Sequence, residues 1–156
     1  MKIPGPDHPI TITVNPRRVR ALYQGHVIAD TDHALALQEA SYPVVQYFPR
    51  EDVAMDFLSR TERGTHCPYK GDAAYYTISR DGEIAENAVW TYEHPYPAME
   101  RIKDFVAFYP NLVEIHEIDE DADPAAIRDA IEHTDSGSGQ SQLDHWAANV
   151  REPKAV

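Results

Sequence analysis

The segment from Tyr47 to Gly71 holds most of the side chains that could perform chemistry. It contains the only cysteine of the chain, Cys67. Around this thiol it gathers the cationic side chains Arg50, Arg60, Arg63, His66 and Lys70. A thiol reacts as its thiolate, and neighbouring cations lower the pKa of a thiol from about 8.5. Cys67 is therefore a candidate catalytic nucleophile with Lys70 beside it, and the alternative is a buried, inert cysteine.

The same segment offers groups that could hold an anion. Arg50 presents a planar fork for carboxylate or phosphate, and Lys70 presents a compact charge. The ligand-binding side chains expected in such a pocket are Arg50, Asp52, Tyr69, Tyr75, Trp90 and Tyr92. The alternatives are that Arg50 pairs with a nearby carboxylate, and that aromatic rings at alternating strand positions belong to a core.

Metal and cofactor sites are not expected. One cysteine cannot build a structural zinc site, and the eight histidines include no His-x-x-x-His pair. Asp30 and Asp32 have the spacing used for Mg²⁺ in nucleotidyl transfer, but the expected upstream Gly-Ser pair is missing. No glycine-rich dinucleotide or phosphate loop is present. We therefore predict no metal and no cofactor.

Length and charge narrow the class of protein. A chain of 156 residues corresponds to one domain of ordinary size. Its 14 basic and 26 acidic residues give a net charge of −12, which opposes binding to nucleic acid or to an anionic membrane. The N-terminus lacks the apolar core of a signal peptide, and no apolar run reaches the roughly 18 residues of a membrane helix. We expect a soluble, cytoplasmic protein.

Local patterns predict a mainly β (α+β) fold, in which antiparallel strands form one compact domain with one or two short helices. Residues 10–14 alternate β-branched side chains, and Gly25 and Asp81-Gly82 mark hairpin turns. Pro49 suits the first position of a helix running to about residue 59, which Gly64 would end before an irregular loop over 65–71. We assign residues 10–118 to the β-rich domain.

Residues 119–156 form an acidic appendage with helical and flexible parts. Asp123 and Pro124 are typical of a helix start, and residues 136–141 have the composition of a flexible linker. Leu143 and Trp146 are expected to dock on the domain or on a second subunit. A homodimer is therefore one expectation.

Four ordered motifs resemble a bacterial family known as domain of unknown function 427, sometimes labelled nucleotidyltransferase-like. They are Tyr-Phe-Pro-Arg-Glu-Asp-Val from Tyr47, Thr65 with Cys-Pro-Tyr-Lys-Gly from Cys67, Asn-Ala-Val-Trp-Thr-Tyr from Asn87 with Pro95, and Phe-Val-Ala-Phe-Tyr-Pro from Phe105. The resemblance covers about residues 17–118. It implies a compact, mostly β domain with a short helix and no established activity.

Two functions remain open from the sequence. The first is binding of a small anionic or nucleotide-like ligand in a pocket near Arg50, Cys67–Gly71 and Trp90. The second is an enzyme that uses Cys67 as nucleophile, or Arg50 and Lys70 to stabilise charge in acyl or phosphoryl transfer.

Overall fold

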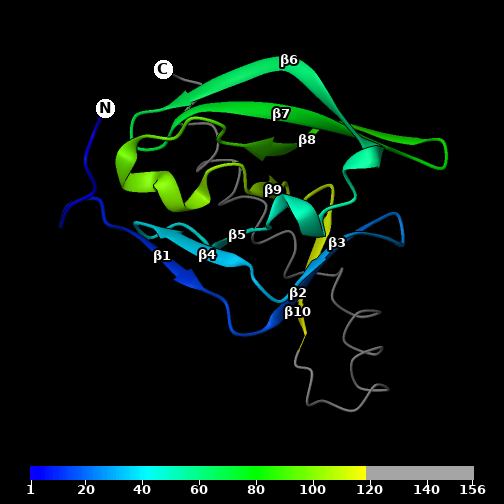
Figure 1. The fold of residues 1–156 in the computed structure, drawn as a ribbon, viewed down its shortest axis with the longest axis horizontal. Coiled ribbons are helices and arrows are strands. Elements are labelled where there is room, and N and C mark those ends of the chain that lie inside the picture. Colours follow the sequence, from blue (N-terminus) through cyan, green and yellow to red (C-terminus); the bar gives the residue numbers. More distant parts are fainter. Residues whose placement is uncertain (119–156) are drawn as a thin grey trace.

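The computed structural model describes residues 1–118, which contain ten strands and three short 3-10 helices (Figure 1). The strands are β1 (Ile10–Val14), β2 (Arg18–Tyr23), β3 (His26–Thr31), β4 (Leu35–Glu39), β5 (Val45–Tyr47), β6 (Leu58–Cys67), β7 (Gly71–Arg80), β8 (Glu83–Thr91), β9 (Val106–Phe108) and β10 (Glu114–Ile118). The helices are η1 (Arg50–Asp52), η2 (Met55–Phe57) and η3 (Pro97–Ile102). The predicted mainly β fold with short helices is confirmed, and the predictions for 119–156 lie outside the described residues.

The strands pair into three antiparallel sheets, with the orders β1-β4-β5, β10-β2-β3 and β6-β7-β8-β9. Two hairpins turn where the sequence predicts. Gln24 and Gly25 join β2 to β3 with φ of 50° and 80°, and Asp81 and Gly82 join β7 to β8 with φ of 52° and 83°. Positive φ at both central residues gives a turn whose twist matches that of the flanking strands.

The four-stranded sheet carries a separate core on each face. On one face, Tyr76, Val89 and Phe108 are in register and join an apolar core with β2 and β3. On the other face, Tyr75, Trp90 and Ala107 are in register and join a core with β4, β5 and η3. Figure 1 shows the long β6–β7 hairpin on one side of the molecule and the β1–β4–β5 sheet opposite it.

The helix predicted from Pro49 to about residue 59 is wrong. Two single turns, η1 and η2, take its place, and Val53 between them is extended with φ of −112°. Val53 bridges Ala29, and the Ala54 N–H donates to the Ile28 carbonyl at 2.8 Å. Pairing with β3 therefore overrides the helical spacing of the apolar residues, as tertiary contacts commonly override a weak local preference.

The irregular loop predicted over 65–71 is also shorter than expected. Strand β6 already begins at Leu58 and continues through Gly64 to Cys67, because β7 offers it a long partner. Only Pro68, Tyr69 and Lys70 remain in the turn. Gly71 has φ of 108°, and a Cβ there would lie 3.3 Å from the His94 carbonyl oxygen, so the tight turn requires glycine.

Candidate functional site

Five aromatic side chains form a tyrosine cluster in the core between the four-stranded sheet and the β1–β4–β5 sheet. They are Tyr47, Tyr75, Trp90, Tyr92 and Tyr109. The Trp90 Nε1–H donates to the Tyr47 hydroxyl at 3.3 Å, and the Tyr109 hydroxyl donates to that of Tyr75 at 3.5 Å. The Trp90 and Tyr109 ring centroids lie 4.8 Å apart. The cluster is thus a core that carries polar groups in its interior.

Burial keeps several of these phenols protonated. It raises the pKa of Tyr47 to about 12, although Lys70 and the hydrogen bond from Trp90 act in the opposite direction. It also raises the pKa of Tyr92 well above the usual value, with added repulsion from Tyr47. Burial and the neighbouring Tyr75 raise the pKa of Tyr109. At neutral pH these groups therefore offer hydroxyls for hydrogen bonding and no phenolate for use as a base.

The Lys70 end of the cluster consists of Lys70, Glu39 and Cys67, and His8 contacts Glu39 from the N-terminal arm. Lys70 donates to Glu39 Oε1, and its Nζ lies 3.8 Å from Cys67 Sγ. The side chains of Lys70 and Glu39 are only 8% and 3% exposed. His8 Nε2 lies 2.8 Å from the second carboxylate oxygen of Glu39. The one cation is thus neutralised by a buried carboxylate beside the thiol.

The pKa shifts at this end follow from that pairing. Burial alone raises the pKa of Glu39, but Lys70 and His8 outweigh it, so the pKa lies below the usual value. Burial alone lowers the pKa of Lys70, but Tyr47, Glu39 and Cys67 reverse the shift and raise it. Both shifts favour the charged pair, a Lys70 ammonium beside a Glu39 carboxylate.

Strand alternation positions these groups. Leu35, Leu37 and Glu39 alternate along β4 and are all buried toward the tyrosine cluster. Glu39 is thus the charged residue of an otherwise apolar face. Lys70 approaches it from the β6–β7 turn, which is held by a hydrogen bond from the Tyr96 N–H to the Lys70 carbonyl at 3.0 Å.

The Arg63 end of the cluster consists of Arg63 and Thr65 of β6 with the hydroxyls of Tyr75 and Tyr109. The Arg63 guanidinium carbon lies 4.8 Å from the centre of the Tyr75 ring. Thr65 Oγ1 is 2.9 Å from the Tyr75 hydroxyl. Within residues 1–118, Arg63 Nε is buried without a hydrogen-bond partner. An unpaired buried N–H costs free energy, so this end has an unmet need for an acceptor.

Two bulges hold Arg63 in place. The β6–β7 pairing loses register between Arg60 and Gly64, and the β7–β8 pairing loses it between Tyr76 and Ile78. The bulges are joined by a hydrogen bond from the Thr61 hydroxyl to Asn87 Oδ1 at 2.6 Å. Thr61 Oγ1 also accepts from the Arg63 N–H at 3.2 Å. Bulges commonly redirect a side chain at a functional site.

Arg50 lies apart from the tyrosine cluster. Its guanidinium donates to the Tyr76 hydroxyl at 3.1 Å and to Thr91 Oγ1 at 3.5 Å, and its Nε–H donates to the Asp104 carbonyl at 3.3 Å. Tyr76 belongs to the core on the opposite face of the four-stranded sheet from Tyr75. Arg50 and the Cys67–Gly71 turn therefore do not line one pocket.

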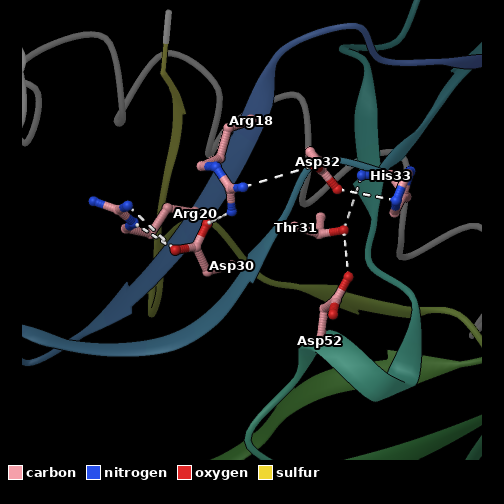
Figure 2. A network of polar contacts seen from close by, with 7 residues as sticks. All are labelled: Arg18, Arg20, Asp30, Thr31, Asp32, His33 and Asp52. Atoms are coloured by element: carbon pink, nitrogen blue, oxygen red, sulfur yellow. Dashed lines mark hydrogen bonds and ion pairs between the residues drawn. The ribbon is translucent and has the colours of Figure 1, made fainter. Parts of the chain in front are cut away.

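Asp52 lies in a polar network further from the cluster (Figure 2). It accepts a hydrogen bond from the Thr31 hydroxyl at 2.7 Å, and this hydroxyl accepts one from the His33 N–H at 2.9 Å. The neighbouring carboxylates of Asp30 and Asp32 are paired with basic side chains. Their ion pairs are Asp30 with Arg18 and Arg20, and Asp32 with Arg18 and His33. The carboxylates of Asp30 and Asp32 are thus already held by basic side chains, and that of Asp52 by the Thr31 hydroxyl.

The structure brings together most of the predicted site residues. Cys67, Tyr75, Trp90 and Tyr92 share one core, and Lys70 contacts it at Cys67, with Tyr69 in the same turn. Arg50 and Asp52 lie elsewhere. The sequence analysis did not assign Glu39, His8, Thr65 or Tyr109 to the site, and it noted Arg63 only as one cation of the segment. The alternation of Leu35, Leu37 and Glu39 was a usable signal, because a charge at an inward strand position needs a partner.

Two searches of the described residues bear on other classes of function. Residues 1–118 contain no group of three or more histidine, cysteine, aspartate or glutamate side chains arranged to hold a metal ion. No helix in this part of the chain has the length and apolar character needed to cross a membrane.

Comparison with known proteins supplies a family. A family model described as a domain of unknown function (DUF427) matches residues 11–119, which is more than half of the chain. A comparison with curated proteins finds no match.

Proposed function

The chain belongs to the DUF427 family, and we propose that it binds a small anionic, nucleotide-like ligand at the Arg63 end of the tyrosine cluster. This location differs from the pocket that the sequence predicts around Arg50, Cys67–Gly71 and Trp90. Trp90 and Tyr75 stay part of it, and Arg63 takes the role that was expected of Arg50.

The observation that carries the proposal is the state of Arg63. Its Nε is buried without an acceptor, and no carboxylate of residues 1–118 forms an ion pair with it. A guanidinium binds a carboxylate or phosphate through two parallel N–H donors. An anion bound here would satisfy a buried donor and a positive charge together.

The surroundings of Arg63 favour an anion that carries a flat group. The Tyr75 and Tyr109 rings are stacked at 16° with centroids 6.5 Å apart, and Trp90 packs against Tyr109. The hydroxyls of Thr65, Tyr75 and Tyr109 provide further hydrogen-bonding groups near the guanidinium. Aromatic walls with a few convergent polar groups are typical of small-molecule sites.

Thermal unfolding with added anions tests the proposal. The probes are AMP, 4-hydroxybenzoate and inorganic phosphate, with adenosine as the uncharged comparison. A ligand at a hundred times its Kd raises the free energy of unfolding by about 2.7 kcal/mol, which gives a measurable rise in Tm. We expect AMP or 4-hydroxybenzoate to raise Tm more than phosphate or adenosine does.

Two arginine variants of equal charge localise the effect. Arg63→Gln should abolish the rise in Tm, whereas Arg60→Gln should keep it, since Arg60 pairs with Glu93 at 2.8 Å. The proposal fails if the two variants respond alike. It also fails if none of the anionic probes shifts Tm.

A second candidate function is an enzyme with Cys67 as nucleophile. The one observation in its favour is the ammonium of Lys70 at 3.8 Å from the sulfur, which would stabilise a thiolate. Against it, Cys67 is only 3% exposed, and the charge of Lys70 is already met by Glu39. Arg50 binds Tyr76, which belongs to the other core from Cys67, and this counts against a transition-state role shared with Lys70.

Alkylation with iodoacetamide separates this candidate from simple ligand binding. A catalytic thiol should be labelled quickly in the native protein at neutral pH. Labelling that appears only after addition of urea would identify Cys67 as an inert core residue and remove the enzymatic candidate.

A further inference from the structure

His8 occupies a defined position against the β6–β7 turn. Its ring stacks on Tyr69 with centroids 4.2 Å apart and an angle of 9° between the planes. Its Nε2 lies 2.8 Å from Glu39 Oε2. Because a carboxylate accepts and does not donate, Nε2 carries the proton of this bond. A flat ring is thus held by stacking on one side and by a buried carboxylate at its edge.

Glu39 needs a donor at this position. Lys70 meets its Oε1 atom, and His8 meets its Oε2 atom, while the side chain as a whole is 3% exposed. A buried carboxylate that loses a hydrogen bond pays a desolvation penalty. Any group that replaced His8 would therefore have to bring an N–H to the same oxygen.

The arm that delivers His8 is anchored at a few points near the chain surface, among them the Lys2 ammonium, which lies 5.9 Å from the centre of the Tyr69 ring. Residues 1–9 are exposed or half-buried throughout, and Met1 and Ile3 are 67% and 66% exposed. Backbone hydrogen bonds tie the arm from the Lys2 N–H to the Pro68 carbonyl at 2.7 Å and from the Ala40 N–H to the Pro9 carbonyl at 2.8 Å. Segments with few buried apolar groups open at low free-energy cost.

We infer that the surface between Tyr69 and Glu39 is a binding site for a flat nitrogen heterocycle bearing an N–H or amino group, such as an aminopurine, and that His8 is its internal stand-in. Bases stack on tyrosine rings, and acidic side chains accept hydrogen bonds from base amino groups. Both interactions are made here by the imidazole. A ligand would displace the arm and repeat them.

Fluorescence of 2-aminopurine provides the test, because stacking on an aromatic ring quenches it. His8→Gly removes the stand-in and keeps the arm. We expect this variant to quench and bind the free base, and the wild-type chain to bind it at least about tenfold more weakly, since the arm must first open. Tyr69→Leu in the His8→Gly background should abolish the quenching.

His33→Gly is the matched control. His33 also faces a carboxylate, Asp32, at 3.0 Å, but its ring is 77% exposed. This variant should bind 2-aminopurine no better than the wild-type chain does. In the wild-type chain, titration with 2-aminopurine should shift the NMR signals of the His8 imidazole and leave those of His33 unchanged. This measurement decides the question if His8→Gly does not fold.

Several outcomes would overturn the inference. They are absence of quenching in a folded His8→Gly variant, quenching that survives Tyr69→Leu, equal affinity of wild type and His8→Gly, and unchanged His8 signals in the wild-type titration. The inference does not rest on the proposed function. Arg63→Gln should leave binding of 2-aminopurine unchanged, because this free base has no negatively charged group for Arg63 to bind.

Discussion

The two ends of the tyrosine cluster hold one cation each, Lys70 and Arg63, and they differ in whether a carboxylate of the protein neutralises that cation. Lys70 is 8% exposed, and the carboxylate that neutralises it is built into β4 as Glu39. Arg63 is half-buried, stacks on Tyr75, and forms no ion pair within residues 1–118. Arg63 and Cys67 lie four positions apart on β6, about 13 Å along the strand.

The difference follows from desolvation. A charge removed from water needs a partner within the protein, or it shifts its pKa and neutralises. A charge at the rim of the core keeps part of its hydration and can leave one coordination position to a ligand. We therefore interpret the Lys70–Glu39 ion pair as structural, and we propose the Arg63 end as the anion site.

The sharpest way to break this comparison is to remove the charge at the Lys70 end. Lys70→Met leaves the Glu39 carboxylate buried without its main partner, and we expect the free energy of unfolding to fall by about 3–5 kcal/mol. Urea unfolding measures it. Lys103→Met is the control, because Lys103 is exposed and its loss should change stability by about 0.5 kcal/mol or less. If Lys70→Met lowered the free energy of unfolding as little as Lys103→Met does, the Lys70–Glu39 pair would not be structural.

The pH dependence of stability sharpens the same point. Lys70 and His8 lower the pKa of Glu39 from its ordinary value of 4.5, so its stabilisation is complete above that value and is lost as pH falls through the lowered one. Glu39→Gln should be less stable than wild type by about 1.5–3 kcal/mol at neutral pH. The gap should narrow in acid, because Glu39 of the wild type loses its charge there, whereas the carboxylates that both proteins share contribute equally to each. A gap that is constant with pH would contradict the assigned pairing.

The smallest expected effect lies at the Arg63 end. Arg63→Met removes a partly exposed contact with the Tyr75 ring, and we expect a loss of about 0.5–1 kcal/mol in the absence of ligand. Arg60→Met removes an exposed ion pair with Glu93 and should cost a similar amount or less. Urea unfolding of both variants beside Lys70→Met checks the order. If Arg63→Met lowered the free energy of unfolding as much as Lys70→Met does, the proposed difference between the two ends would be contradicted.

Local signals predicted a large part of this fold. The Asp81-Gly82 and Gly25 turns, the alternating strand of residues 10–14 and the mainly β class all depend on neighbouring residues, and the structure confirms them. The helix from Pro49 failed because its outcome depended on β3, a partner more than 20 residues earlier in the chain. Local spacing contains no information about such a partner.

The candidate site was predicted in its composition and not in its arrangement. The sequence by itself determined that a thiol, several cations and several aromatic rings fall within one motif-rich segment and the hairpin that follows it. The tertiary structure alone decided that Arg50 binds Tyr76 and not Tyr75, and these two tyrosines belong to different cores because adjacent strand residues point to opposite faces of the sheet. It also decided that Lys70 meets Glu39, 31 residues away in the sequence, while Arg63 does not gain a carboxylate within residues 1–118. Burial then determined which of the two cations had to be neutralised.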